Sequence, residues 1–308
     1  RDPLWSRGLG DVYKRQKVYL VGAGPGDPNL LTRRAEHLLY KADVVLYDRL
    51  VNPFILQLTR PDAQLINVGK IPYHPTTKQE EINQQLIASA EKHGCVVRLK
   101  GGDPAIFGRL QEEVEALERE NIDYEVVPGV TSASAAVASL CIGLTSRRLS
   151  NSVTYCTGQA VIDTPERFVS MMQQGTLAIY MGIKRIGQIM STIQQETDID
   201  YPVNVIFQAS YEREQVIKGH VSTIASQVEG SDVDGPGLIL IGPVLDLEKM
   251  FNTKVSTPEL LQGDRTANIA RAFEIYEEGR TAFLDIDPHC DYHPSQLALI
   301  QHIKETLL

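Results

Sequence analysis

The sequence predicts an α/β protein built from two lobes, with the functional site in a cleft between them. Short apolar runs typical of buried strands alternate with amphipathic helical stretches from residue 17 onward. A second series of strands and helices begins after "VVPGV", residues 126–130. Glycine-rich loops directly follow two of the expected strands, where the backbone can approach a small molecule. Together these observations predict a mostly parallel N-terminal sheet and a mixed C-terminal sheet.

The first series alternates strands with helices, which implies parallel strands joined by helical crossovers. The helix over 30–41 is predicted because its apolar residues recur at helical spacing. Gly94 is suited to close the helix that precedes it. The expected strands are 17–22, 43–48, 63–69, 95–101 and 124–129, and the expected helices are 30–41, 78–94 and 110–120.

The second series contains strands that follow one another too closely for parallel crossovers, so we expect a mixed sheet. After residue 242 the pattern changes to helices at about 264–278 and 294–307 and a short apolar run at 281–287. The expected strands of the second series are 152–158, 176–182, 201–210, 214–222 and 237–242, and the expected helices are 131–140 and 184–195.

The predicted domains follow from these patterns. Residues 1–16 show neither helical nor strand periodicity and are expected to be a disordered leader or cloning remnant. Residues 17–128 are expected to form an N-terminal α/β domain and residues 129–245 a C-terminal α/β domain. Residues 246–308 form a mostly helical extension in which no known domain is recognisable.

Charge and composition exclude several classes of partner. Residues 1–160 carry 19 Lys and Arg against 18 Asp and Glu, whereas residues 161–308 carry 11 against 21, and the whole chain is at −9. Neither half is strongly basic, so a nucleic acid partner is not expected. No apolar run approaches the ~20 residues of a membrane span. The cysteines are expected to be buried free thiols in a reducing cytoplasm, with the exception of Cys290, which lies in a polar stretch. They are Cys95, Cys141, Cys156 and Cys290.

The first glycine loop, "VGAGPGDP" at 21–28, has the context of a dinucleotide-binding turn, with Asp48 ending the next strand. The spacing argues against an NAD-dependent oxidoreductase, because Asp27 stands where the third glycine is needed. Pro25 also lacks the N–H that a pyrophosphate would require. The loop is better suited to another ligand, with a tight turn that binds nothing as the plain alternative.

The second loop, "KGGDP" at 100–104, offers two glycines that let a ligand reach the backbone. Asp103 can accept hydrogen bonds from hydroxyl groups or interact with a cation. Asp-Pro turns are common, so this loop taken alone is a weak indication of a site.

The ordered set of motifs is far more specific than either loop. "VGAGPGDPNLLT", "ADVVLYDRLV", "VGK" followed by "QEEIN", "VVRLKGGDPAIFGR", "EVVPGVTSASAA" and "YMG" occur in this order. Over roughly residues 17–245 the chain resembles the tetrapyrrole methylase family, and within it the C-methyltransferases of uroporphyrinogen III.

The resemblance implies the two-domain tetrapyrrole-methylase fold, a homodimer, and S-adenosylmethionine (SAM) held in the cleft between the domains. Its motif positions for the proton acceptor and donor fall on Asp48 and Lys70. The positions that match the family's SAM contacts are Pro25, Gly101, Gly102, Asp103, Ile106, Thr131, Ser132, Met181 and Ala209.

The implied reaction makes chemical sense of these residues. Methyl transfer from a sulfonium is an in-line displacement that depends mainly on positioning. A methylated pyrrole carbon requires a proton to leave elsewhere on the macrocycle, so one base and one acid are useful. Two plainer alternatives remain: Asp48 caps the next turn, and Lys70 is a solvated loop cation.

The implied acceptor is a macrocycle with eight carboxylates, which accounts for basic residues near the loops. We expect Arg49, Arg109 and Arg147 to matter most. The full set is Arg49, Lys70, Arg98, Lys100, Arg109, Arg147 and Arg148.

Two departures from the family pattern bear on the choice of acceptor. Leu110-Gln111 stand where the family has two glycines, and "GLTSR" at 143–147 has Gly143 and Ser146 where the family has Pro and His. The alternatives are therefore a methylase of a later corrinoid intermediate and a non-catalytic tetrapyrrole-binding protein.

In the extension, "DIDPHCDYHP" at 285–294 suggests either a metal site or, as we prefer, a polar turn, because no second Cys/His pair lies at zinc-finger spacing.

Overall fold

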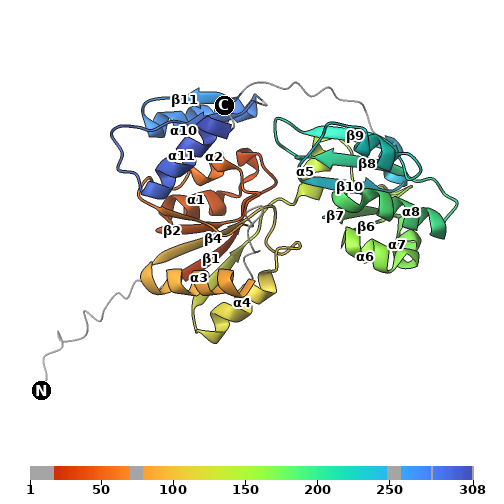
Figure 1. The fold of residues 1–308 in the computed structure, drawn as a ribbon, viewed down its shortest axis with the longest axis horizontal. Coiled ribbons are helices and arrows are strands. Elements are labelled where there is room, and N and C mark those ends of the chain that lie inside the picture. Colours follow the sequence, from red (N-terminus) through yellow and green to blue (C-terminus); the bar gives the residue numbers. More distant parts are fainter. Residues whose placement is uncertain (1–16, 70–78, 248–257, 279, 307–308) are drawn as a thin grey trace, which may run out of the picture. The chain divides into compact units, whose positions relative to one another are not determined.

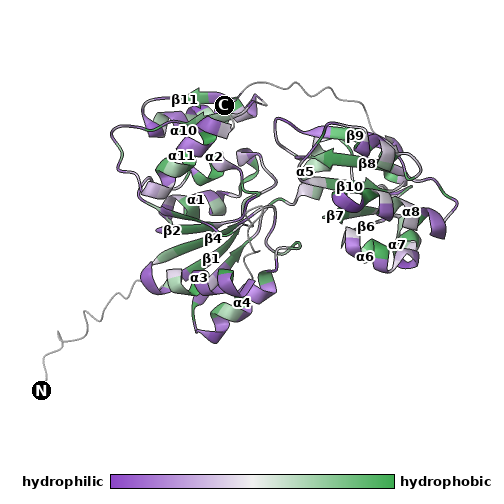
Figure 2. Cartoon of the chain, in the orientation of Figure 1, coloured by the Kyte–Doolittle hydropathy of each residue, from purple (hydrophilic) through white to green (hydrophobic). Residues whose placement is uncertain are grey.

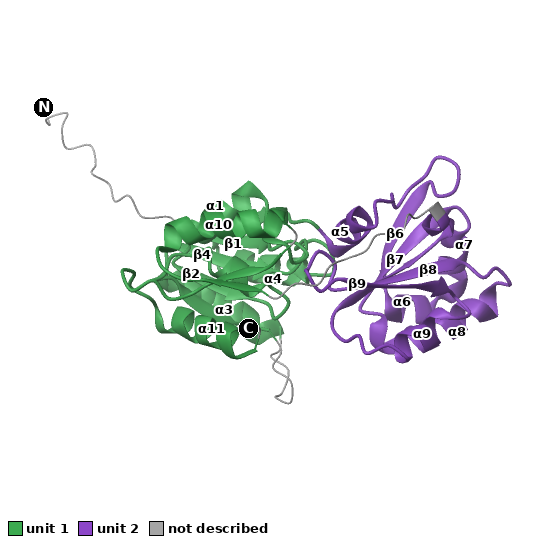
Figure 3. Ribbon diagram, turned by 90° about the horizontal axis from the view of Figure 1, so that it is seen from above, with its two compact units in different colours: residues 1–130, 257–308 green, residues 131–256 purple. Residues whose placement is uncertain are grey.

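A computed structural model describes residues 17–69, 79–247, 258–278 and 280–306. The chain divides into two compact units, shown in different colours in Figure 3. Unit 1 comprises residues 1–130 and 257–308, and unit 2 comprises residues 131–256. The C-terminal extension therefore belongs to the same unit as the N-terminal α/β segment.

Unit 1 is built on a five-stranded sheet in which every neighbouring pair is parallel, with the order β3-β2-β4-β1-β5. The expected N-terminal parallel sheet is thus confirmed. All five carboxyl ends lie at one edge of the sheet, the edge at which ligands bind in open α/β folds. The strands are β1 (Lys17–Gly22), β2 (Val44–Tyr47), β3 (Gln64–Asn67), β4 (Cys95–Lys100) and β5 (Asp123–Val127).

Helices cover both faces of this sheet (Figure 1). One face packs against α3 and α4 through Leu86 and Leu117, and the other packs against α1 and α2 through Leu39 and Phe54. Both sheet faces are apolar, and polar residues gather on the outer sides of the helices (Figure 2). The helices are α1 (Arg33–Lys41), α2 (Pro53–Leu56), α3 (Gln79–Lys92) and α4 (Leu110–Arg119).

The predicted helix over 30–41 is shorter in the structure, for a local reason. Pro28–Leu30 forms a 3-10 turn, and α1 begins only at Arg33 because the Thr32 hydroxyl accepts a hydrogen bond from the Ala35 N–H at 3.1 Å. A dinucleotide-binding turn places the helix N-terminus directly at the glycine loop. The late start of α1 therefore argues against that type of site.

The extension packs onto the α1 and α2 side of unit 1. Its helices were predicted, whereas β11 and its parallel pairing with β12 were not. Phe273 makes an edge contact with Phe54, with ring centroids 5.9 Å apart. The fully buried Gln57 side chain donates to the Leu284 carbonyl at 2.8 Å and accepts from its N–H at 3.1 Å. The elements are β11 (Glu259–Leu261), α10 (Arg265–Glu277), β12 (Ala282–Leu284) and α11 (Pro294–Thr306).

Unit 2 contains a second five-stranded sheet with the order β6-β7-β10-β8-β9. Only β6 and β7 are parallel, and the other pairs are antiparallel, which confirms the expected mixed sheet. The strands are β6 (Ser152–Thr157), β7 (Gly175–Tyr180), β8 (Pro202–Phe207), β9 (Gln215–His220) and β10 (Gly237–Ile241). The helices are α5 (Ser132–Ser139), α6 (Gly158–Asp163), α7 (Pro165–Met172), α8 (Ile186–Glu196) and α9 (Ile224–Glu229), of which α6, α7 and α9 were not predicted.

Two expectations about cysteines and metals can be compared with the structure. All four cysteines are free, but only Cys156 is buried, and Cys141 is exposed.

In the stretch 285–294, Asp287 accepts hydrogen bonds from the backbone N–H groups of Arg265 and His289. No group of three or more metal-ligating side chains occurs within the described ranges. Nor does any helix there combine the length and the apolar character that a membrane crossing requires.

Candidate functional site

The two glycine loops are joined directly through their backbones. Gly24 donates to the Gly102 carbonyl at 3.2 Å, and Gly102 donates to the Gly24 carbonyl at 2.7 Å. Both residues have left-handed backbones, with φ of 72° and 69°, which glycine adopts without strain. The sheet brings them together because β1 and β4 are neighbours in parallel register, with Gly22 opposite Lys100.

A third loop, which follows β5, closes against the first two. A Cβ on Gly129 would lie 2.2 Å from the Gly102 carbonyl oxygen, and a Cβ on Gly22 would lie 2.6 Å from the Gly129 nitrogen. Side chains are excluded here because the neighbouring atoms belong to rigid backbone. We call Gly22, Gly24, Gly102 and Gly129 the glycine cradle. It lies at the carboxyl edge of the parallel sheet.

Asp103 ties two of these loops together. Its Oδ1 accepts a hydrogen bond from the Ala105 N–H at 2.7 Å, and its Oδ2 accepts from the Gly129 N–H at 3.1 Å. The Ile106 N–H donates to the Asp103 carbonyl at 3.1 Å, so the loop turns tightly after the acid. Pro25 is half-buried in the first loop, where the Asn52 side chain donates to the Gly26 carbonyl at 2.8 Å. Pro25, Gly101, Gly102, Asp103 and Ile106 are thus on joined loops of unit 1.

Asp48 lies at the carboxyl end of β2, next to β4, and its side chain contacts Arg98. The distance from Arg98 Nη2 to Asp48 Oδ1 is 2.5 Å. Asp48 does not cap α2, because Asn52 accepts the capping hydrogen bond from the Phe54 N–H at 2.9 Å. The turn that directly follows Asp48 is closed by its carbonyl, which accepts from the Val51 N–H at 3.2 Å, so a turn-forming role for Asp48 stays as the plainer alternative.

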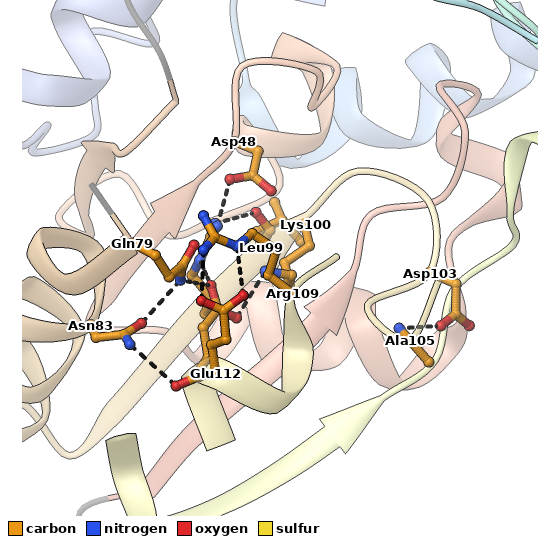
Figure 4. A network of polar contacts seen from close by, with 11 residues as sticks. Asp48, Gln79, Asn83, Leu99, Lys100, Asp103, Ala105, Arg109 and Glu112 are labelled. Atoms are coloured by element: carbon orange, nitrogen blue, oxygen red, sulfur yellow. Dashed lines mark hydrogen bonds and ion pairs between the residues drawn. The ribbon is translucent and has the colours of Figure 1, made fainter. Parts of the chain in front are cut away.

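Arg98 belongs to a buried network of charges, part of which Figure 4 shows between β4 and α4. Glu113 Oε1 lies 2.9 Å from Arg98 Nε, and Glu113 Oε2 lies 2.8 Å from Lys100 Nζ. Arg98, Lys100 and Glu113 are 2%, 3% and 0% exposed. Burial lowers the pKa of Lys100, and Arg98 adds to that effect, while Glu113 opposes it.

The substrate-binding candidates of unit 1 are exposed. Arg109 forms a two-pronged ion pair with Glu112, at 2.7 and 2.6 Å. Arg49 is exposed, and its backbone packs against Gly69, where a Cβ would lie 2.5 Å from the Arg49 nitrogen. Lys70, the candidate proton donor, lies outside the described residues.

In unit 2, three candidates gather around one tyrosine. The Thr131 and Tyr180 hydroxyls are 2.7 Å apart, and the Ser132 hydroxyl also hydrogen bonds to Tyr180. Met181 follows directly and is 68% exposed, which is unusual for a large apolar side chain. Ala209 is buried in the same apolar cluster as Ala133 of α5, whereas Arg147 is exposed in a loop.

Strained backbone marks the loops that carry the candidates. Left-handed non-glycine residues store strain and are frequent at binding sites. Most of those in the described part of the chain flank candidate residues: Phe107 and Arg109 in the second loop, Met181 itself, and Gln208 and Ser210 on either side of Ala209.

Residues 17–225 match the family described as Tetrapyrrole (Corrin/Porphyrin) Methylases. The chain belongs to the tetrapyrrole methylase family. This tetrapyrrole methylase is 42% identical over 234 residues to a uroporphyrinogen-III C-methyltransferase of Bacillus subtilis, a match that covers 75% of this chain and 91% of the relative. It is 44% identical over 236 residues to a siroheme synthase of Hahella chejuensis, covering 75% of this chain and 50% of the relative. The chain thus spans about half the length of the siroheme synthases it matches.

A solved structure agrees with the family assignment. The uroporphyrin-III C-methyltransferase of Thermus thermophilus, complexed with S-adenosylhomocysteine, has a TM-score of 0.64 and 37% sequence identity. The match covers 75% of this tetrapyrrole methylase and 99% of the Thermus chain. The family model therefore covers residues 17–225, and both the relative and the solved structure cover about three quarters of the chain.

Sequence reasoning missed Glu113 and misread two of the basic residues in this tetrapyrrole methylase. Arg98 and Lys100 were expected near the acceptor's carboxylates, yet both are buried and paired with Glu113, so that interpretation is wrong for them. The strand alternation contained the signal, because Val96, Arg98 and Lys100 share one face of β4. A charged residue there requires a partner on the covering helix, and "EE" at 112–113 supplies it.

Proposed function

We propose that this tetrapyrrole methylase is a SAM-dependent C-methyltransferase that methylates uroporphyrinogen III at two ring positions to give precorrin-2. Precorrin-2 is the precursor of sirohaem and of cobalamin-type tetrapyrroles. The proposal is supported by the B. subtilis relative, which aligns over 91% of its own length. It is also supported by the Thermus structure, which aligns almost completely and is complexed with S-adenosylhomocysteine.

The observation that carries the proposal is the glycine cradle. Three loops meet there with no room for a Cβ at Gly22 or Gly129, so the loops that carry the candidate residues are held close together at the carboxyl edge of the sheet. Polar backbone groups of these loops and the half-buried, apolar Ile106 side chain suit an adenosyl and amino-acid moiety, which needs polar backbone partners and one apolar contact. The residues of the cradle therefore fit SAM.

The proposed contacts to SAM lie on both units. In unit 1 they are Pro25, Gly101, Gly102, Asp103 and Ile106. In unit 2 they are Thr131, Ser132, Met181 and Ala209. When bound, SAM supplies an electrophilic methyl group on a sulfonium, and the protein contributes chiefly by holding donor and acceptor in position.

The proposed proton transfers use Asp48 and Lys70. Asp48 accepts the proton that leaves the macrocycle after methyl transfer, and Lys70 donates a proton to the macrocycle. Arg49, Arg109 and Arg147 hold the acceptor's carboxylates, for which a guanidinium provides two parallel hydrogen bonds. Arg109 already makes such a pair with Glu112, so an acceptor carboxylate would compete with that residue.

We further propose that the enzyme is a cytoplasmic homodimer with no nucleic acid or membrane partner. Residues 1–160 are nearly neutral and residues 161–308 are acidic, so neither half has the basic surface that a nucleic acid partner would need. The dimer is tested by light scattering of the purified chain, which gives twice the monomer mass if the proposal is correct.

The decisive experiment is a methyl-transfer assay under anaerobic conditions. The purified chain is incubated with uroporphyrinogen III and SAM, and the products are analysed by mass spectrometry. We expect a product heavier by two methyl groups with the wild type, and a much slower but measurable formation of that product with Asp48→Asn. Ion pairs on distant surfaces serve as a control: Arg271→Gln, whose partner Glu274 is also exposed, should keep full activity.

Other outcomes of the same assay decide between the alternatives. Methylation of a later corrinoid but not of uroporphyrinogen III would identify the related methylase. Binding of SAM without turnover of either acceptor would indicate a non-catalytic tetrapyrrole-binding protein. Calorimetry with S-adenosylhomocysteine and with NAD tests the oxidoreductase, for which we expect no NAD binding.

A further inference from the structure

We propose that Arg98 is the positioning residue for Asp48, and that Glu113 holds Arg98 in place for this purpose. The inference deepens the proposed function and rests on it, because it concerns the residue proposed as the proton acceptor. It assigns a role to a network in which Arg98, Lys100 and Glu113 are buried and the Asp48 side chain is partly exposed.

The strand geometry places Arg98 between the two carboxylates. Arg98 and Lys100 lie on the same face of β4 as Val96, the face covered by α3 and α4. Glu113 is in the first turn of α4 and points at that face. Asp48 follows the adjacent strand β2, whose Leu46 lies opposite Arg98 in register. Arg98 therefore bridges a helix on one side and the end of a neighbouring strand on the other.

Each nitrogen of the Arg98 guanidinium has an acceptor. Nε lies 2.9 Å from Glu113 Oε1, Nη1 donates to the Leu99 carbonyl at 3.1 Å, and Nη2 lies 2.5 Å from Asp48 Oδ1. A planar group held at three points cannot rotate without losing at least one of these contacts. The orientation of the Asp48 carboxylate is consequently set by a rigid, buried cation.

Glu113 is the residue that keeps the guanidinium in this position. Its second oxygen pairs with Lys100, and Gln79 Nε2 lies 3.4 Å from Oε1. Within the network, two cations balance two carboxylates, so no buried charge is left without a counter-charge. Asp48 differs from the others because its side chain is 33% exposed, whereas those of Arg98, Lys100 and Glu113 are at most 4% exposed.

Stability alone does not account for the network. A buried ion pair contributes little compared with well-packed apolar side chains of similar size, and it is costly once one partner is removed. In contrast, holding a reactive carboxylate in one orientation directly benefits proton transfer, because misplacing a catalytic group lowers the rate strongly. Among the described residues, Asp48 Oδ2 has no hydrogen-bond partner, which leaves this oxygen free to accept a proton.

A double-mutant cycle tests the proposal. Arg98→Lys keeps the positive charge but lacks the planar, rigid fork whose separate N–H groups point at Glu113 and at Asp48. We expect kcat to fall by about 10-fold or more, with the KM values for both substrates changed by less than about two-fold. In the Asp48→Asn background the same Arg98 substitution should change kcat by less than about two-fold, since its effect passes through Asp48.

A matched control and a second variant keep the outcome unambiguous. Glu115→Gln makes the same kind of change as Glu113→Gln, in the same helix but at an exposed position, and should leave kcat unchanged. Thermal unfolding is recorded for every variant. If Arg98→Lys does not fold, the cycle is run with Glu113→Gln and Asp48→Asn, with the same expected non-additivity.

The results separate this inference from the proposed function. Equal losses of kcat in the presence and absence of Asp48 would show that Arg98 acts only on the fold, and would overturn the inference while the proposed function stands. A wild type that does not methylate uroporphyrinogen III would overturn both.

Discussion

Gly24 and Gly102 exchange two backbone hydrogen bonds, at 3.2 and 2.7 Å, although they lie 78 positions apart in the chain. The pair joins the loops after β1 and β4 at the carboxyl edge of the sheet. Because both loops are held by backbone rather than by side chains, their spacing depends on glycine at several positions.

Gly129→Ala should abolish tight binding of S-adenosylhomocysteine without unfolding unit 1. The new Cβ would lie 2.2 Å from the Gly102 carbonyl oxygen, and the backbone there cannot move without separating the loops. We expect the affinity measured by calorimetry to fall by at least about 10-fold, since a shift of the loops displaces several polar partners at once. Gly187→Ala is the matched control, because its Cβ meets only Glu229 at 3.6 Å. An unchanged affinity in Gly129→Ala would show that the cradle does not hold the ligand.

Arg147→Ala should raise the KM for uroporphyrinogen III and leave kcat nearly unchanged. A hydrogen bond between two charged groups contributes about 1.5–3 kcal/mol, which corresponds to a change in KM of about 10-fold or more. Steady-state kinetics with varied acceptor concentration provide the measurement. Arg167→Ala removes another exposed arginine of unit 2 and should behave as the wild type. Equal KM values in the two variants would remove Arg147 from the acceptor site.

Gln57→Met should detach the C-terminal extension from its support. The substitution leaves the N–H and the carbonyl of Leu284 without their partners in a fully buried position. Each unsatisfied group costs about 1–3 kcal/mol, so we expect the free energy of unfolding to fall by about 2–4 kcal/mol. Urea denaturation measures this loss. Gln301→Met, on the exposed side of α11, should change it by less than about 0.5 kcal/mol.

Because the Cys156 thiol is buried, the free energy of unfolding should decrease as the pH becomes alkaline. Burial raises the pKa of its thiol from 9.0 to about 12. Between these values the unfolded chain loses the thiol proton while the folded chain retains it, so stability is lost as pH rises, by at most about 1.4 kcal/mol per pH unit. Below pH 9 the thiol contributes no pH dependence.

The measurement compares wild type and Cys156→Ala by denaturation at several pH values. The difference between their free energies of unfolding should shrink above about pH 9. Cys141→Ala, at an exposed position, should follow the wild type at every pH. A difference between wild type and Cys156→Ala that is the same at pH 8 and pH 11 would contradict the assignment of about 12 to this pKa.

The order of strands and helices could be predicted from local patterns, because apolar periodicity follows directly from which side of an element is buried. The strand at 17–22 occurs with the expected bounds, and the strands expected at 152–158 and 237–242 each end one residue earlier. Short helices such as α2 and α9 were missed, since four to six residues carry too little periodicity to reveal a helix. The strand at Glu259–Leu261 was missed because three residues cannot show alternation.

In the candidate site too, some features could be predicted from neighbouring residues and others depend on residues far apart in the chain. The glycine loops, Asp48 and the family resemblance were evident from residue types in sequence order. The role of Arg98 was not, because a basic residue beside a glycine loop looks the same in sequence whether it faces solvent or a helix. Its burial depends on α4 covering that face of β4, and the helix starts 12 residues later in the chain.

Sequence order alone therefore established the α/β class, the two series of strands and the loops that belong to a tetrapyrrole methylase. Those features depend on the spacing of neighbouring residues. The tertiary structure was needed to join Gly24 to Gly102, to pair Arg98 with both Glu113 and Asp48, and to place the extension on α2. Each of these contacts connects residues far apart in the chain. Local sequence preferences do not determine which distant residue will pair with a buried charge or pack against a glycine backbone.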